Sequence, residues 1–593
     1  MSKIFVGLLA ILISLSSCTK KNDDGGLAVF HGSFIDDIKS LDPASAYDTL
    51  SLDILPSIYE TLYQYSYLAI PYAVEPLLAA DMPKFSADRL TVTIPIRQGI
   101  HFQDDACFKA NNGKGRELKA QDFVYAFKRL ALPSPVSAGF WILSEKVVGV
   151  NAFHDKIANA DKAAREKIME EPLEGVRALD DYTLQIKLTK PYPQILYVLA
   201  MGFSAPVAHE VVEAYGDDKG SITEHPVGTG PFTLKTWDRG RQIVLDRNPT
   251  FHTDFYPTKA ADRFRERGLL ADAGARLPML DRVSINIIKE HQPSWLNFMK
   301  GNQDVVAIPR DSFSQAIANS AGLSPQLAKK GIQLNIETGT HFYYISFNAK
   351  DKIVGQNKAL RQAMSSAINR EKWIEIFTNK TGMKAGGLLP PRIPDRPQFQ
   401  TLKYDYNLER ARELMKKAGY PEGKGLPELN FDLRGANTAN RQLGEFFAQQ
   451  FAAIGIRINV IYNTLPSFLE KGKTGNLQVF AGGWAMDYPD AENVFQLLYG
   501  PNRAPGTNDS NFDNAEFNKL YEQIAVMDPS TKRAELVHHM DDIVQEECIW
   551  ALGYYHAAYE LTQPWLLNYR GSSIINNKFK YFRIDRELKA KQP

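Results

Sequence analysis

Cysteine is scarce in this chain. Its 593 residues include three cysteines, Cys18, Cys107 and Cys548, and no Cys-x-x-Cys pair. A thiol redox motif and a cysteine-based zinc site are therefore not expected. Cys107 and Cys548 lie far apart in the sequence, so we expect two isolated buried thiols. A disulfide between them stays open as the alternative, because the sequence does not show whether their Cα atoms come within bridging distance.

An excess of charge of one sign is also missing. The chain has 69 Lys and Arg against 68 Asp and Glu, which gives a formal net charge of +1. This balance creates no large positive field to attract phosphate, so no nucleic-acid partner is expected. Hydrophobic residues make up 44% of the chain, as in proteins that bury large cores.

Catalytic signatures are absent as well. The chain has no Gly-x-Ser-x-Gly elbow. His209 and Glu210 begin like a zinc-protease motif, but its second histidine is missing. His538 and His539 are adjacent and so do not share a helix face. We therefore expect a protein that is not an enzyme, with no catalytic residues, no metal site and no cofactor.

Only the amino-terminal residues form a long apolar run. Residues 4–15 follow Lys3 and are apolar except for one glycine and one serine. A membrane span needs about 20 apolar residues, so this run is too short. Its pattern is typical of a secretory signal, here 1–17. The string LSSC at 15–18 resembles a bacterial lipobox, in which Cys18 is lipidated; an ordinary secretory signal is the alternative.

The segment that follows the signal is polar and ends in two glycines, as a flexible tether would. Residues 18–26 would then tie the body of the protein to a membrane surface outside the cytoplasm. The sequence leaves open which membrane holds the anchor. No second apolar run of spanning length follows, so we expect a monomeric body attached through lipid alone.

Helical and extended patterns alternate along the chain. Apolar residues recur at every second position in three strings, which predicts half-buried strands at 91–96, 183–188 and 282–287. Apolar residues recur at helical spacing in three others, which predicts helices at 122–130, 407–420 and 441–456. The fold class is therefore α/β.

Six further strings stand in a recognisable order. They are LDPA with ILPSIYETLY (41–63), LKAQDFVYAFKRL (118–130), GTGPFTLKTWDRGRQIVLDRNPTF (228–251), LRQAMSSAINREKW (360–373), YDYNLERARELMKKAGY (404–420) and GGWAMDYPDAENVF (482–495). From about residue 29 to its end, the chain resembles the extracytoplasmic solute-binding proteins of peptide-type ABC transporters, known as family 5.

The resemblance implies a two-lobed periplasmic-binding-protein fold of the large, peptide-binding type, which is type II-like. Lobe I would consist of 27–76, 191–339 and 561–593, with an extra domain inserted at 77–190. Lobe II would be 340–560. By resemblance, the protein captures oligopeptides or dipeptides between the lobes and delivers them to a membrane permease. The alternatives are a non-peptide solute, such as a nickel chelate, haem, an oligosaccharide or an opine, and a sensor without a transport role.

The string GGWAMDYPD carries the expected ligand contacts. By resemblance, Asp487 meets the α-ammonium of a peptide, and a carboxylate in a dry cleft makes a strong bond to such a group. Trp484 would form a wall beside it, with Tyr488 next in the chain. The alternative is that Asp487 or Asp490 caps a helix that begins near Ala491, and for Asp490 we favour the cap.

Five more side chains are weaker candidates for ligand contact. The resemblance places Glu60 and a set of tyrosines at the cleft, and core packing is the alternative for each ring. The tyrosines are Tyr343, Tyr344, Tyr554 and Tyr555.

The chain also departs from the family pattern. Some relatives have an arginine, suited to a ligand carboxylate, where Ala481 stands here. The charged segment 257–278 is longer than in many relatives and is expected to lie on the surface. Gly228 and Gly230 in GTGPF are expected to allow backbone geometries closed to other residues. This string is not a phosphate loop, because the Gly-Lys-Ser/Thr ending is missing.

Replacing the expected lipidation site should release the protein from the membrane. Cys18→Ala removes the only thiol at the end of the signal, so the variant should be soluble and unlabelled in cells fed radioactive palmitate. Fractionation of the labelled cells measures both properties. Membrane association and labelling equal to those of the wild type would contradict the lipobox interpretation.

Overall fold

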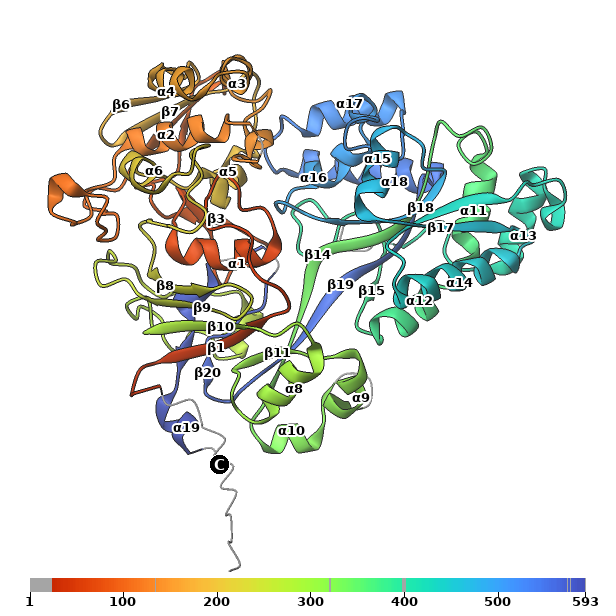
Figure 1. Cartoon of the computed structure of the whole chain (residues 1–593). Coiled ribbons are helices and arrows are strands. Elements are labelled where there is room, and N and C mark those ends of the chain that lie inside the picture. Colours follow the sequence, from red (N-terminus) through yellow and green to blue (C-terminus); the bar gives the residue numbers. More distant parts are fainter. Residues whose placement is uncertain are drawn as a thin grey trace, which may run out of the picture.

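The structure is a computed structural model that describes residues 24–133, 135–318, 322–396, 401–572, 574–575 and 577–591. The expected signal at 1–17, Cys18 and most of the tether lie outside these residues, and their roles stay predictions. Figure 1 shows two bodies joined by a pair of long strands. Each body has its own large core.

The first body is built on a four-stranded sheet in the order β1-β10-β9-β8, with β1 parallel to β10 and the other pairs antiparallel. The strands are β1 (Val29–Phe34), β8 (Phe232–Asp238), β9 (Gln242–Arg247) and β10 (Arg282–Ile287). The strand predicted at 282–287 is confirmed as β10, and its Val283 and Ile285 are buried.

A second, antiparallel sheet has the order β4-β5-β7-β6 and lies at the top of the same body (Figure 1). Its strands are β4 (Lys84–Phe85), β5 (Thr91–Pro95), β6 (Val176–Asp180) and β7 (Thr183–Lys187). The helix predicted at 122–130 is confirmed as α2 (Ala120–Leu130), which buries Phe123, Phe127 and Leu130. This sheet, α2 and the first sheet share one continuous core, although 77–190 is predicted as a separate domain. The predicted domain boundaries stay predictions.

Short helices and strand pairs complete the first body. The helices are α1 (Thr49–Ile58), α3 (Val150–Ala158), α4 (Lys162–Glu170), α5 (Ile195–Val198), α6 (His209–Tyr215), α7 (Asp262–Glu266), α8 (His291–Met299), α9 (Phe313–Ala316), α10 (Pro325–Lys329) and α19 (Arg586–Ala590). The paired strands are β2 (Tyr63–Tyr65) with β3 (Val74–Pro76), β12 (Ile317–Ala318) with β13 (Gly322–Leu323), and β20 (Leu566–Leu567) with β21 (Arg583–Ile584).

A seven-stranded sheet connects the two bodies, in the order β11-β19-β14-β18-β16-β17 with β15 paired to β19. Its strands are β11 (Val305–Ala307), β14 (Gln333–Phe347), β15 (Met383–Lys384), β16 (Leu429–Arg434), β17 (Ile458–Asn463), β18 (Val479–Ala485) and β19 (Trp550–Thr562). One end of the β14–β19 pair meets β11 in the first body, and the other end meets β18 in the second.

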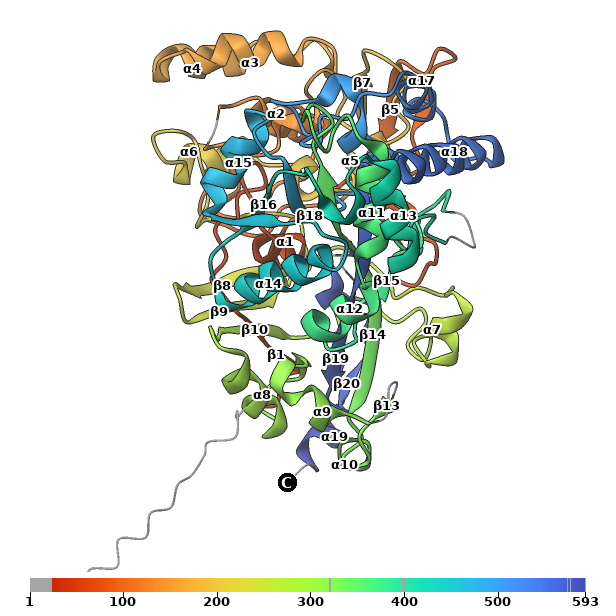
Figure 2. The same cartoon turned by 90° about the vertical axis from the view of Figure 1, so that its right-hand side faces the viewer.

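Helices surround the second body's part of this sheet (Figure 2). They are α11 (Lys358–Ala367), α12 (Arg370–Thr378), α13 (Leu408–Lys417), α14 (Thr438–Ala452), α15 (Leu465–Lys473), α16 (Ala491–Phe495), α17 (Ala515–Ile524) and α18 (Thr531–Glu547). The helices predicted at 407–420 and 441–456 are confirmed as α13 and α14. Gly419 and Gly455 follow them with φ of 87° and 83°, so each chain reversal uses a conformation that favours glycine.

Two expectations about loops and cysteines have different outcomes. Cys107 and Cys548 are both buried and free, as expected. The segment 257–278 was expected on the surface, but α7 buries Phe264 completely in a small core of its own. Figure 2 shows α7 beside β14, and the Arg263 guanidinium donates to the Ile336 carbonyl of that strand at 2.7 Å. The segment therefore supports the strands that join the lobes.

The glycines of GTGPF allow a close approach rather than an unusual φ. Neither Gly228 nor Gly230 is among the residues with positive φ. A Cβ on Gly228 would lie 2.2 Å from the Ile58 carbonyl oxygen, and one on Gly230 would lie 2.6 Å from the Ile58 carbonyl carbon. The string thus packs directly against the end of α1. This contact fixes the residues that follow α1, including Glu60.

A methyl group at Gly230 should therefore destabilise the fold. Because the obstacle is backbone, Gly230→Ala should lower the free energy of unfolding by about 1–3 kcal/mol, as other overpacked sites do. Gly322→Ala is the matched control, because its added Cβ meets no atom within 4 Å. Urea denaturation of both variants measures the difference. Equal stability of the two variants would contradict the close-approach explanation.

Candidate functional site

A cavity of about 420 Å³ lies between the two bodies. The first body contributes the loop and helix around Tyr47 to Tyr65, the turn at 200–203, and Asn577 and Lys580. The second body contributes His341, Arg434 and the segment 483–487. This volume lies within the range of small-molecule sites, about 300–1,000 Å³. The cavity therefore has the position and size of an inter-lobe ligand site.

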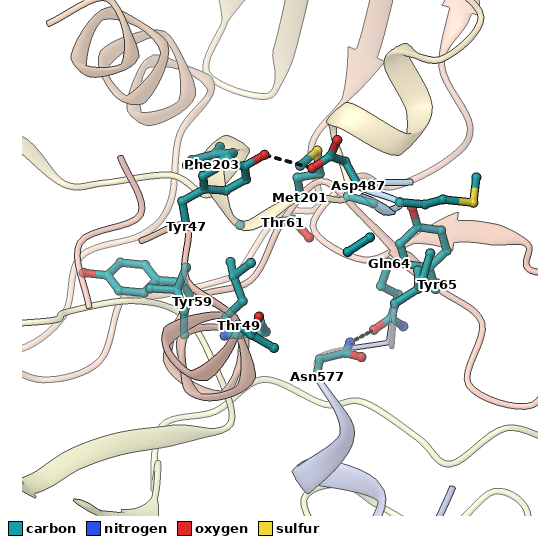
Figure 3. A pocket seen from close by; sticks show the side chains of 18 of the residues that line it. Tyr47, Thr49, Tyr59, Thr61, Gln64, Tyr65, Met201, Phe203, Asp487 and Asn577 are labelled. Atoms are coloured by element: carbon teal, nitrogen blue, oxygen red, sulfur yellow. Dashed lines mark hydrogen bonds between the residues drawn. The ribbon is translucent and has the colours of Figure 1, made fainter. Parts of the chain in front are cut away.

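Asp487 lies just beyond the end of β18 and faces this cavity (Figure 3). Its Oδ1 accepts a hydrogen bond from the Tyr47 hydroxyl at 2.9 Å, and its Oδ2 accepts one from Asn493 Nδ2 at 3.1 Å. Tyr47 belongs to the first body and Asp487 to the second. The Tyr47–Asp487 bond therefore crosses the cavity and connects the lobes.

Asp487 is a desolvated carboxylate without a cationic partner. Burial raises the pKa of its carboxyl above the usual value, although hydrogen bonds from Asn493 and Tyr47 act in the opposite direction. No Lys, Arg or His in the described part of the chain forms an ion pair with it, whereas the buried Asp42 pairs with Arg129 at 2.7 Å. The two oxygens have lone pairs beyond those used by Tyr47 and Asn493. The site can therefore accept a ligand cation.

Asp490, three residues further on, has a structural role. It is the N-cap of α16, and its Oδ1 accepts hydrogen bonds from the Glu492 amide at 2.9 Å and from Arg533 at 2.6 Å. Arg533 is fully buried and also pairs with Asp395. The prediction that Asp490 caps a helix near Ala491 is confirmed.

Trp484 lies on β18 and lines the cavity, with its indole N–H donating to Asn493 Oδ1 at 3.1 Å. The two glycines before it make room for rings rather than for a ligand backbone. A Cβ on Gly482 would lie 2.4 Å from the Tyr344 ring, and one on Gly483 would lie 2.9 Å from the Tyr343 ring. Asn493 thus holds Trp484 and Asp487 together through hydrogen bonds. Gly482 and Gly483 leave the space that the rings of Tyr344 and Tyr343 occupy.

The remaining predicted tyrosines pack inside the protein. None is among the described residues that line the cavity. Tyr343 stacks on Tyr554 with ring centroids 4.8 Å apart, and Tyr555 exchanges hydrogen bonds with the Gly387 backbone. Tyr344 stacks on Trp550. Tyr488 is buried, and its hydroxyl donates to Glu492 at 2.6 Å. Their contact with ligand stays a prediction, and these positions match the core-packing alternative.

Glu60 does line the cavity, but its charge is already paired. His252 Nε2 lies 2.9 Å from its Oε2, and the Thr229 hydroxyl donates to the same oxygen at 3.0 Å. Burial is the largest single effect and lowers the pKa of His252, but the charge of Glu60 and its hydrogen bond together outweigh it, so the net shift of this pKa is upward. Lys580 at the cavity floor is likewise paired with Asp254 at 2.8 Å.

Sequence reasoning missed Tyr47 and Arg434. Arg434 is the last residue of β16, is exposed and lines the cavity, with its guanidinium 4.7 Å from the Phe468 ring centroid. In the described chain no Asp or Glu forms an ion pair with it. Because β16 and β18 are parallel neighbours, their carboxyl ends meet at one sheet edge, where α/β folds bind ligands. The position of Arg434 at the end of the string LNFDLR could have indicated it as a ligand contact. No local sequence pattern indicated Tyr47.

These features define a two-lobed α/β binding protein with a charged cleft. Residues 73–506 match the sequence profile of the bacterial extracellular solute-binding proteins, family 5 Middle, and the chain belongs to this family. Both predictions, of the fold and of the family, are confirmed. In the described residues, no three His, Cys, Asp or Glu side chains group as a metal site requires. Over the same residues, no helix has the length and apolar character needed to cross a membrane.

Three known proteins are similar over most of their length. Heme-binding protein A of Haemophilus influenzae is 25% identical over 80% of this chain and 78% of that protein. The glutathione-binding protein GsiB of Salmonella paratyphi A is 26% identical over 86% of each. The solved structure of the periplasmic binding protein DppA from Helicobacter pylori, in complex with the peptide STSA, has a TM-score of 0.70 at 21% identity and covers 94% of this chain and 98% of that one.

The different pairing of the two aspartates predicts opposite stability effects. Asp490→Asn leaves the buried Arg533 with one carboxylate partner, Asp395, and should lower the free energy of unfolding by about 3 kcal/mol at pH 7. Asp487→Asn removes an unpaired, desolvated charge and should leave stability unchanged or raise it.

The pH dependence of these variants provides the control. The folded pKa of Asp487 is raised, so the wild type loses stability as pH rises from the usual carboxyl value, about 4, through the raised one. Any gain in the free energy of unfolding from Asp487→Asn should therefore vanish at acid pH, where the wild-type carboxyl is protonated. Urea titrations at several pH values measure it. A large loss for Asp487→Asn at neutral pH would show that the carboxylate is structurally paired.

Proposed function

We propose that this protein captures short peptides in the cavity between its lobes and delivers them to an ABC-type permease. The observation that supports this is a pair of opposite charges in one cavity, the carboxylate of Asp487 and the guanidinium of Arg434, neither of which forms an ion pair with a described residue. A free peptide has an ammonium group at one end and a carboxylate at the other. The family membership and the glutathione-binding relatives agree with such a ligand.

Each charge matches one end of a peptide. The ammonium group would donate to the free lone pairs of Asp487, beside the face of Trp484, in a site where few waters compete. The Arg434 fork would hold the carboxylate through two parallel hydrogen bonds, a geometry that lysine does not offer. At about 420 Å³ the cavity favours a peptide of few residues. In this proposal the protein performs no covalent chemistry.

Closure of the two lobes would be coupled to the contact between Asp487 and the peptide ammonium group. Tyr47 reaches across from lobe I and donates directly to Asp487 in lobe II, so an ammonium group on the free lone pairs of Asp487 would lie beside a contact that joins the two lobes. Hinge rotation about the strands that join the lobes would then present a closed form to the permease. We also propose that Cys18 anchors the protein as a monomer to a membrane surface outside the cytoplasm.

Blocking either end of a peptide should test the two anchors separately. With Ala-Phe as the probe, Asp487→Asn should weaken binding by about a hundredfold, because the ligand ammonium is then buried without a partner. N-acetylated Ala-Phe should bind the wild type poorly, and Asp487→Asn should discriminate less between free and acetylated peptide. Arg434→Gln should likewise discriminate less between Ala-Phe and its carboxyl amide. Calorimetric titration measures all of these affinities.

Glu60→Gln is the control for these titrations, because Glu60 lines the cavity but already pairs with His252. That variant should discriminate between free and acetylated peptide as the wild type does. If acetylation leaves wild-type affinity unchanged, the amine anchor is wrong, and a non-peptide solute becomes the better proposal.

A further inference from the structure

A second cavity, of about 250 Å³, lies on the other side of α1 in lobe I. Thr49, Leu52 and Pro56 of α1 face the cavity between the lobes, whereas Leu50 and Asp53 face the second one. The two cavities share no described lining residue. The second cavity is therefore a separate site, and the proposed peptide capture does not involve it.

The walls of this cavity have an apolar majority and a polar part formed by Ser33, Ser294 and Gln303, which hydrogen-bond to one another. Strands β1 and β10, the strand pair β11–β19 and the 3₁₀ turn Lys578–Tyr581 enclose it, and their aromatic and branched side chains face inward. The apolar lining includes Phe30, Phe34, Ile285, Val306, Phe579 and Phe582.

The carboxylate of Glu560 on β19 lines this cavity, together with those of Asp53 and Glu290. Its Oε2 accepts a hydrogen bond from the Tyr569 hydroxyl at 2.7 Å, and Gly571 closes behind it so tightly that a Cβ there would lie 2.7 Å from Oε2. Among the described residues no donor bonds to the other oxygen, Oε1. Burial raises the pKa of this carboxyl, with Tyr569 and Lys578 acting in the opposite direction.

The nearby charges do not neutralise Glu560. Lys578 lies at the cavity, but its ammonium group pairs with Asp53 at 3.0 Å. Glu290 and His291 stand at the rim and are exposed. With the lysine already paired, the cavity has an excess of negative charge, and a cation is the complementary ligand.

We propose that this cavity is a second ligand site, for a small organic ammonium ion with an apolar body. The ammonium group donates to Glu560 Oε1, and an aromatic or branched hydrocarbon of modest size fills the space between β1, β11 and the 3₁₀ turn. A volume of about 250 Å³ is smaller than most drug-sized pockets, so the ligand is a simple amine rather than a peptide.

The test uses 2-phenylethylamine as the probe and 2-phenylethanol as its uncharged counterpart. Both are titrated by calorimetry into full-length Asp487→Asn protein, so that the cleft between the lobes does not compete for the amine. The amine should bind at one site, and the alcohol should bind about tenfold or more weakly, because it lacks the charge-assisted bond to Glu560.

Three further substitutions in this background locate the site. Glu560→Gln should weaken amine binding about tenfold or more while keeping the acceptor for Tyr569. Ala307 on β11 pairs directly with Glu560 on β19 and is exposed, so Ala307→Leu should block the cavity without disturbing the core. Glu290→Gln, at the rim, is the matched control and should change little. Absence of saturable amine binding, equal affinity for amine and alcohol, or binding unaffected by both Glu560→Gln and Ala307→Leu would overturn the proposal.

Discussion

The long antiparallel pair β14–β19 is the constraint on which the rest of the structure depends. Its ladder pairs Gln333 with Thr562 in the first body and Ser346 with Trp550 in the second, so the same two strands belong to both cores. The lobes are thereby held side by side, and any relative motion must occur as rotation about these strands. The register shift between Thr338 and Phe342 interrupts the ladder near the predicted lobe boundary. The small number of residues at this interruption could absorb the backbone change that such a rotation requires.

Charge pairing distinguishes structural groups from groups available to a ligand. Arg129 with Asp42, and Arg533 with Asp490, are buried pairs that satisfy each other inside the protein. An unpaired buried charge is costly, so proteins tolerate one mainly where a ligand supplies the partner. Asp487 in the cleft is half-buried and forms no ion pair with a described residue, and it is held in position by neutral donors rather than by a cation.

Local patterns in the sequence predicted local structure well. The helices α2 and α13 and the alternation in β10 are all present where they are predicted, because helical and extended periodicities depend only on near neighbours. Asp490 could be recognised as a cap for the same reason. The family resemblance supplied the expected role of Asp487; the position of Arg434 at the end of an apolar strand was also visible in the sequence but was not used.

The sequence by itself determined the α/β class, the family and most helices and strands, since each is encoded over short stretches. The tertiary structure alone decided which side chains are paired, because partners such as Tyr47 and Asp487 stand 440 residues apart. It also decided that the glycines of GTGPF serve a backbone contact with Ile58, and that the candidate tyrosines pack on neighbouring rings. Burial and pairing depend on contacts that only the folded chain creates, and these contacts separate a binding group from a structural one.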